Sequence, residues 1–356
     1  MTSQATLLYY NCNLFENEDF VITNKFFVEQ EELLCKNYTP TESVFKKISV
    51  KYSCEWIQSD MWDVNLSAVL IPIKDNKELI KFTISNLKEN DIHKNSNIII
   101  IDDRSEENIK SIALENNLSY LRVDNDKGFN FSMLNNIAAK ICYELGVKDI
   151  ILWNSDLWCV KKEWFLLLLE KHRNEHSTIS GSKLVYPPSE MSLNEEEDTE
   201  NIRSFFPNMI NGRWRETIQF GGSGWFTMEP RTSPVSISPI HCFRFCDITD
   251  NRVNCDKGES FVTGALQVID LKWFIDAGGL NPSLSKNFQD VDICLKAIKN
   301  NKKIFYFGKN MYFYHDESAS LAKGGKHDDQ LFSDHVLFGK IWNKHIYKLV
   351  LGIDKF

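Results

Sequence analysis

Asn154, Ser155 and Asp156 interrupt an apolar stretch at a point where a side chain could do chemistry. The preceding residues 150–153 are typical of a buried strand, whose carboxyl end would place Asp156 just beyond the sheet. A carboxylate in that position suits a divalent metal that carries a phosphate. Asp156 could equally open a turn, and this stretch alone leaves both interpretations open.

Two other predicted strands end in carboxylates. Asp75 follows the apolar residues 66–73, and Asp102 and Asp103 follow the β-branched run 97–101. Each carboxylate could simply cap the helix that comes next. Because the carboxyl ends of parallel strands meet at one edge of a sheet, three such strand ends together favour a shared site.

The second half of the chain places two carboxylates, Asp290 and Asp292, at the start of a predicted helix. Both could stabilise the helix by interacting with its dipole. Alternatively, Asp290 could be a general base, kept ionised because the dipole lowers its pKa.

Gly264 lies in the middle of a predicted strand, residues 261–269, where a missing side chain allows a ligand to approach closely. His315 ends the aromatic stretch 311–315. A lone histidine is more often a hydrogen-bonded structural residue than a ligand.

The elements that position these residues alternate between strand and helix from residue 66 to residue 176. This alternation predicts an α/β fold with a doubly wound, mostly parallel central sheet flanked by helices. The predicted strands in this part are residues 66–73, 97–102, 120–123 and 150–153, and the predicted helices are residues 76–90, 106–117 and 132–145. Further on, the pattern predicts a helix at 271–277, a helix from Asp290, a strand at 303–307 and an amphipathic helix at 330–345.

We expect four parts along the chain. Residues 1–63 form an N-terminal extension, expected to pack as helices and loops, and residues 64–325 form the main domain. Its first half, residues 64–180, would bind a nucleotide, and its second half, residues 181–325, would face the other substrate. Residues 326–356 contribute the C-terminal helix.

The composition narrows the possible partners and the compartment. With 41 Lys and Arg against 49 Asp and Glu, the net charge is -8, which argues against nucleic acid as the main partner. The sequence shows no signal peptide and no apolar stretch of membrane-spanning length, so we expect a cytoplasmic protein. The nine cysteines are predicted to be free thiols, because the spacing of His241, Cys242, Cys246 and Cys255 matches no paired zinc pattern.

Phosphate-binding loops of the common kinds are absent. The sequence has neither Gly-x-Gly-x-x-Gly nor Gly-Lys-Ser/Thr. A bound nucleotide would therefore be held by carboxylates and a metal.

The order of motifs resembles that of the inverting glycosyltransferases of family 2, which have the GT-A fold. The resemblance covers roughly residues 66–320 and includes the strand end around Asp103 and the segment Asn154-Ser155-Asp156 in the place of the Asp-x-Asp metal motif. The segment 129–136 resembles Phe-Asn-Tyr-Ser-x-x-Asn-Asn of a subgroup that acts on surface polysaccharides. The other matching segments are 69–75, 218–222, 263–265, 278–281, 289–292 and His315.

The resemblance implies a role for each matched residue. Asp75 and Asp103 would contact the base or ribose of the donor, Asp156 and His315 would bind Mn²⁺ or Mg²⁺ on the diphosphate, and Asp290 would be the catalytic base. The remaining donor-binding residues would be Pro72, Ser105, Asn130, Asn136, Asn154 and Ser155, and the acceptor-side residues would be Gly264, Gln289 and Asp292.

The resemblance also implies the substrates. The donor would be a UDP-, GDP- or dTDP-sugar. The acceptor would be a glycan or lipid-linked glycan in surface polysaccharide or glycoconjugate synthesis, with at most peripheral membrane contact at the inner face.

Three residues depart from the family pattern. Asn154 stands where the metal motif often has its first Asp, Gln289 replaces the usual Glu before the base, and Ala138 replaces a common Gly. A catalytically silent sugar-nucleotide or glycan-binding protein is therefore one alternative. A nucleotidylyltransferase is the other, although residues 72–76 lack the Gly-rich, basic loop of those enzymes.

Overall fold

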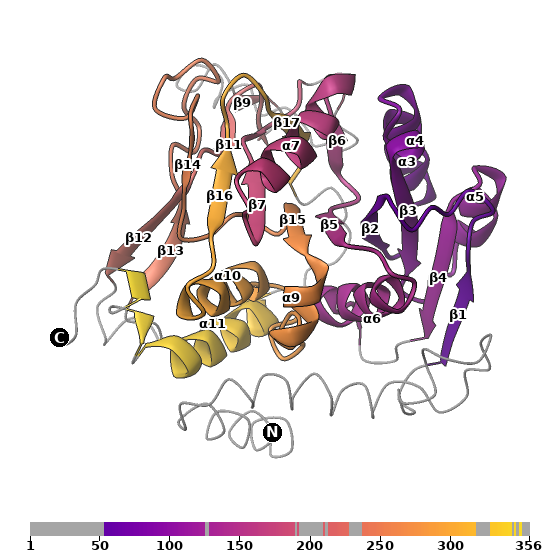
Figure 1. Ribbon diagram of the computed structural model, residues 1–356. Helices are drawn as coiled ribbons and strands as arrows, with labels where there is room; N and C mark the ends of the chain where they lie inside the picture. The colour runs from indigo at the N-terminus through magenta and orange to yellow at the C-terminus, as the bar shows by residue number, and fades with distance from the viewer. Residues whose placement is uncertain are drawn as a thin grey trace.

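A computed structural model describes residues 53–124, 128–188, 191, 209–210, 213–227, 237–317, 328–343, 345–346 and 349–350. Among these residues, nine strands form one central sheet in the order β1-β4-β3-β2-β5-β15-β7-β16-β14 (Figure 1). The strands are β1 (Ser53–Ile57), β2 (Ser67–Ile73), β3 (Ser96–Asp102), β4 (Ser119–Asp124), β5 (Asp149–Trp153), β7 (Ile179–Ser182), β14 (Asp256–Gly258), β15 (Leu266–Asp270) and β16 (Ile304–Phe307).

The sheet is mostly parallel, as predicted. Strands β4, β3, β2 and β5 pair in parallel, and β15 runs antiparallel to both β5 and β7. Because β16 is parallel to β7, six of these nine strands point the same way, and β1, β14 and β15 oppose them. Every residue of β2 and of β3 is buried, which explains why both strands are apolar without alternation.

Two groups of helices flank the sheet (Figure 1). The first group contains α3 (Lys77–Glu89), α4 (Ile92–Asn95), α5 (Ile109–Glu115) and α7 (Lys162–Asn174). The second group contains α6 (Phe131–Glu144), α9 (Leu271–Asp276), α10 (Gln289–Lys299) and α11 (Asp328–Trp342). Side-chain caps start several of them: the Asn76 side chain accepts a hydrogen bond from the Leu79 N–H, and Asn130 does the same for Met133. No helix among the described residues is long and apolar enough to span a bilayer.

Smaller sheets extend the second half. Strands β11 (Ile218–Phe220), β8 (Leu184–Val185), β17 (Phe313–His315) and β6 (Leu157–Cys159) form one four-stranded sheet. The other small strands are β9 (Met209–Ile210) with β10 (Arg213–Trp214), and β12 (Ser223–Thr227) with β13 (Ile237–His241). The pairing of β17 with β6 brings His315 opposite Leu157, next to Asp156 in the chain.

The structure corrects two expected elements. The strand expected at residues 261–269 begins only at Leu266, because the backbone N–H of Gly264 is bonded to Asp290 and not to a neighbouring strand. Residues 53–57, expected among helices and loops, form β1 and pair with β4 at the edge of the sheet. Residues 1–52 lie outside the described part of the chain, and the predicted part boundaries stay predictions.

Candidate active site

Asp156 and His315 form a buried pair just beyond the carboxyl end of β5. The Asp156 Oδ1 lies 3.3 Å from the His315 Nε2, and the two residues are 3% and 5% exposed. Burial by itself lowers the pKa of His315, but the charge of Asp156 and the hydrogen bond to it, with Glu317 and Asp316 nearby, raise that pKa overall. The Asp156 carboxylate therefore favours a positive charge at this position.

The loop before β15 connects this pair to Asp290. The Asn154 N–H donates to the Ala265 carbonyl at 3.1 Å, and the Gly264 N–H donates to the Asp290 Oδ2 at 2.7 Å. The Asn154 Nδ2 also lies 3.3 Å from the His315 Nε2. Four segments that are distant in sequence therefore meet in one continuous set of contacts.

Gly264 is required in this arrangement for a steric reason. A Cβ at residue 264 would lie 3.1 Å from the Asp290 Cβ and 3.5 Å from the Asp290 Oδ2. The missing side chain therefore allows close approach, as predicted, but the group that approaches in this structure is the Asp290 carboxylate.

The electrostatics of Asp290 differ from the prediction. The helix dipole was expected to lower its pKa, but desolvation of the carboxyl group raises the pKa above the usual value. Hydrogen bonds from the Gly264 and Val291 N–H groups oppose this shift without cancelling it. A carboxylate with a raised pKa is a stronger base, which suits proton abstraction.

Asp292, two residues further along α10, is fully buried. Its Oδ2 lies 2.8 Å from the Lys296 Nζ, and its Oδ1 accepts a hydrogen bond from the Trp342 Nε1 at 2.9 Å. The predicted acceptor-side role is not favoured for this residue, because its carboxylate joins α10 to α11 and offers no exposed surface. Gln289 is also nearly buried, and its Oε1 has no hydrogen-bond partner among the described residues.

The predicted donor residues Asp75, Asp103 and Ser105 lie together at the ends of β2 and β3. The Asp75 N–H donates to the Ser105 Oγ at 2.7 Å, and the Asp103 N–H donates to the Ile73 carbonyl at 2.9 Å. The Asp75 Oδ1 accepts a hydrogen bond from the Glu106 N–H at 2.8 Å, so this carboxylate also holds the loop that follows β3. Because β2 pairs in parallel with β5, this cluster and Asn154-Ser155-Asp156 lie at the same edge of the sheet.

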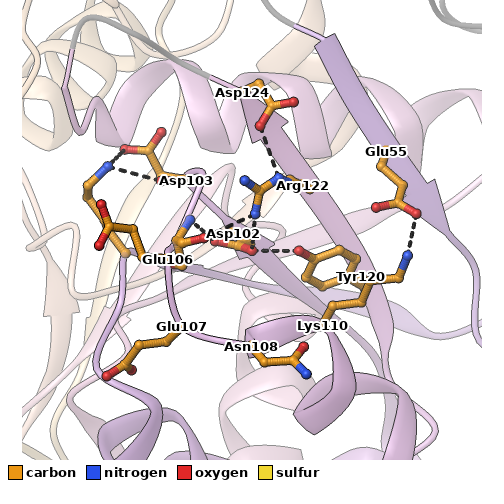
Figure 2. Close-up of polar contacts among 12 residues, drawn as sticks. Glu55, Asp102, Asp103, Glu106, Glu107, Asn108, Lys110, Tyr120, Arg122 and Asp124 are labelled. Atoms are coloured by element: carbon orange, nitrogen blue, oxygen red, sulfur yellow. Dashed lines mark hydrogen bonds and ion pairs between the residues drawn. The ribbon is translucent and has the colours of Figure 1, made fainter.

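Figure 2 shows that the neighbouring carboxylates Asp102 and Asp103 have different environments. Asp102 Oδ2 accepts hydrogen bonds from the Tyr120 hydroxyl at 2.5 Å and from the Arg122 Nη1 at 3.3 Å. Asp103 is fully buried, and its Oδ2 lies 3.9 Å from the half-exposed Lys74 Nζ. Asp102 therefore holds β3 to β4, while Asp103 is associated with the loop after β2.

The remaining predicted donor residues have structural contacts. The Asn136 side chain, 3% exposed, exchanges two hydrogen bonds with the Leu280 backbone, at 2.8 and 2.9 Å. Asn130 donates to the Pro282 carbonyl at 2.8 Å. Pro72 lies within the buried strand β2, and Ser155 is 6% exposed with its carbonyl bonded to the Thr83 hydroxyl.

Sequence reasoning missed the polar residues of α3 that hold the loop after β5. Thr83 bonds the Ser155 carbonyl, and Asn86 accepts the Cys159 N–H at 2.8 Å while donating to the Cys159 carbonyl at 2.9 Å. The available signal was the position of Thr83 and Asn86 on the apolar face of α3, beside Leu79 and Ile80.

The described residues contain no cluster of three or more His, Cys, Asp or Glu side chains that could hold a metal. The seven described cysteines are free thiols, as predicted, and His241, Cys242, Cys246 and Cys255 form no such cluster. Asp156 and His315 nevertheless fit a divalent ion that is shared with a diphosphate, because Mg²⁺ is usually held by one or two protein ligands together with phosphate oxygens and water.

Part of the chain matches a known protein family. Residues 68–231 match the model of glycosyl transferase family 2. The chain is 25% identical over 285 residues to the uncharacterized protein y4gI of Sinorhizobium fredii. This match covers 78% of the chain and 27% of that protein. The chain thus spans little more than a quarter of the curated relative that it matches.

Solved glycosyltransferase structures are also similar in outline. GalNAc-T7 with UDP, GalNAc and Mn²⁺ has a TM-score of 0.49 and 14% identity, with 71% of this chain and 44% of that chain covered. TarS 1–349 of S. aureus has a TM-score of 0.43 and 14% identity, with 71% and 61% covered.

The mostly parallel nine-stranded sheet and its flanking helices confirm the predicted α/β fold class. The family match is confined to residues 68–231 of the chain.

Proposed function

We propose that this protein is an inverting glycosyltransferase that moves a sugar from a nucleotide-diphosphate sugar to a hydroxyl of a glycan acceptor. The observation that carries the proposal is the continuous set of contacts from Asp290 through Gly264 and Ala265 to Asn154, and from there to His315 and Asp156. These contacts support the proposal because they link a carboxylate with a raised pKa to a pair that would suit a metal-bound diphosphate.

The reaction is a single displacement. The acceptor oxygen forms a bond to the anomeric carbon from the face opposite the diphosphate, the bond from that carbon to the diphosphate oxygen breaks, and the nucleoside diphosphate leaves with the bonding electrons. Asp290 takes the hydroxyl proton as the acceptor attacks. One in-line displacement inverts the anomeric configuration, so no covalent nucleophile is needed.

Asp156 and His315 would hold Mn²⁺ or Mg²⁺, which supplies Lewis-acid stabilisation of the charge that develops on the diphosphate. The Asn154 Nδ2 lies 3.3 Å from the His315 Nε2 and would orient that ring. Asp75, Asp103 and Ser105, at the same sheet edge, would contact the base or ribose. A glycan of surface polysaccharide or glycoconjugate synthesis is the acceptor class we propose.

The test is to incubate the purified protein with UDP-, GDP- and dTDP-sugars, with Mn²⁺ or with EDTA, and to follow release of nucleoside diphosphate. We expect metal-dependent release with at least one donor and faster release when a glycan acceptor is added. Tight donor binding without turnover in any acceptor preparation would instead support a silent sugar-nucleotide-binding protein.

A further inference from the structure

We infer that α11 positions the catalytic base: Asp334, with Phe338, holds the segment of residues 286–288 in the one conformation that aims Asp290 at Gly264. This inference rests on the proposed role of Asp290. Figure 1 shows α11 lying beside α10, although the two helices are separated along the chain by strands β16 and β17.

Helix α10 has no capping side chain of its own. Its N-cap residue, Phe288, makes no side-chain cap hydrogen bond. Instead, the Asp334 Oδ2 accepts the backbone N–H groups of Lys286 at 3.0 Å and Asn287 at 2.9 Å. Asp334 is fully buried, so a carboxylate of α11 fixes the two residues that come directly before the N-cap of α10.

Phe288 is held in a conformation that an aromatic residue rarely adopts. Its φ is 63° and its ψ is 0°, in the left-handed region, which costs on the order of 1–3 kcal/mol for a residue other than glycine. The Phe288 ring stacks on Phe338 with centroids 4.6 Å apart and meets the edge of His335 at 4.4 Å. Two side chains of α11 thus offset the backbone strain.

The first turn of α10 begins at this residue. The Phe288 carbonyl accepts the Asp292 N–H at 2.8 Å, and Asp292 is itself bonded to Trp342 of α11 at 2.9 Å. Asp290 lies between these two fixed points, with its Oδ2 on the Gly264 N–H. If Phe288 relaxed to an ordinary backbone conformation, the first turn would rotate and the Asp290 carboxylate would leave Gly264.

Asp334 is therefore a positioning residue, and its loss should affect the chemical step more than donor binding. A misplacement of about 1 Å far from the reacting atoms can cost on the order of 100-fold in rate. We expect Asp334→Ala to lower kcat roughly 10- to 100-fold, with the donor KM unchanged because Asp156 and His315 lie on other elements. Asp334→Asn keeps an oxygen that can accept the two N–H groups and should restore most of kcat.

Two readouts separate positioning from a general loss of stability. Leu337→Ala is the matched control, because Leu337 is buried on the same helix at 3% exposure, while Asp334 accepts the hydrogen bonds from residues 286 and 287. It should lower the melting temperature at least as much as Asp334→Ala while leaving kcat near the parent value. In the pH profile of kcat, Asp334→Ala should move the acidic limb to higher pH, because the N–H groups that lower the pKa of Asp290 are lost.

Amide hydrogen exchange tests the same inference without turnover. In the 356-residue chain, Asp334→Ala should speed exchange over residues 286–292 and leave β2 and β5 unchanged, whereas Leu337→Ala should not single out 286–292. Equal exchange in the two variants, or an unchanged kcat in a folded Asp334→Ala protein, would overturn the inference. Full transfer activity in Asp290→Asn would instead refute the proposed base, with the exchange result still deciding whether α11 holds the segment.

Discussion

The end of β3 and the start of α10 each carry two closely spaced carboxylates, and the two regions are fixed by different means. At β3, Asp102 is bonded to Tyr120 and Arg122 of the next strand in sequence, β4. At α10, Asp292 is paired with Lys296 and bonded to Trp342, fifty positions away along the chain. Asp102 and Asp292 therefore have structural roles. Their neighbours Asp103 and Asp290 are the carboxylates that we propose for the site.

The difference indicates how the two sides of the site respond to change. The donor side, around Asp75 and Asp103 at the ends of β2 and β3, is built from consecutive strands and helices. Its geometry therefore follows directly from the sheet. The base side depends on contacts among α10, α11 and the loop before β15. Substitutions on the base side should therefore reduce catalysis, whereas those behind the donor side should mainly reduce stability.

The largest effect should come from Asp290→Asn. Removing a general base typically costs about 10²–10⁴-fold in rate, and the amide can still accept the Gly264 N–H, so we expect transfer to fall within that range while donor binding persists. Steady-state transfer and calorimetric binding of the nucleoside diphosphate would check this. Asp276→Asn, at an exposed carboxylate paired with Lys272 at 2.7 Å, is the control. Unchanged transfer in Asp290→Asn would show that Asp290 is not the catalytic base.

Asp156→Ala should have the second-largest effect on transfer. Loss of Lewis-acid stabilisation worth several kcal/mol corresponds to more than about 100-fold in rate, and we expect weaker donor binding as well. Titration with Mn²⁺ and nucleoside diphosphate would measure the affinity. Asp149→Ala changes a carboxylate at the opposite end of the same strand, paired with Arg173 at 3.0 Å, and should leave binding intact. Parent-like Mn²⁺ dependence in Asp156→Ala would contradict the metal assignment.

Gly264→Ala should have an intermediate effect. The added Cβ would meet the Asp290 Cβ at 3.1 Å, closer than ordinary contact, so the carboxylate must shift. We expect kcat to fall roughly tenfold, a small fraction of the loss that a full ångström of misplacement brings. At Gly258 a Cβ would meet only the Ile304 carbonyl oxygen at 3.9 Å, so Gly258→Ala should be nearly silent. Comparable kcat values for the two variants would argue against close packing of residue 264 on the base.

On the donor side, Tyr120→Phe should affect stability more than rate. The variant removes the hydroxyl that donates to the buried Asp102, a loss of about 1–3 kcal/mol, while Arg122 still holds the carboxylate. Urea unfolding would measure the change in free energy, and kcat should stay within about twofold, well under the tenfold that 1.4 kcal/mol represents. Tyr143→Phe, at a residue 37% exposed, is the control. A large fall in kcat of Tyr120→Phe without loss of stability would show that the Tyr120 hydroxyl contributes to catalysis as well as to the structure.

The smallest expected effect is on the pH dependence of the folding stability. Because the folded-state pKa of Asp290 is raised, the folded protein binds its proton more tightly than the unfolded chain does. The wild-type protein therefore loses stability as pH rises from the unfolded pKa through the raised folded pKa. Asp290→Asn lacks this penalty, so it should be more stable than wild type at neutral pH and equal to it in acid. Thermal melts across pH would check this, and a variant less stable at neutral pH would contradict the raised pKa.

Much of the fold was predictable because its signals are local. Residues 68–73 and 98–101 are apolar without interruption since β2 and β3 are buried on both faces, and a carboxylate lies at or within two residues of each strand end. The placement of Asp75 and Asp103 at one edge followed from parallel pairing alone.

The rest depends on contacts between distant segments. Asn136 matched a family motif, yet its amide is used by the backbone of Leu280, 144 positions away. The pKa of Asp290 was predicted in the wrong direction, because a sequence shows the helix start but not the desolvation around it. Similarly, no local pattern indicates that Asp334 caps the segment before α10.

The central claim, a single displacement assisted by one base, is tested most directly by the anomeric configuration of the product. Proton and carbon NMR of the glycan during the first turnovers distinguish the two anomers through their coupling constants and carbon shifts. A single displacement gives a product whose anomeric configuration is opposite to that of the nucleotide sugar. A product that keeps the configuration of the donor would contradict it.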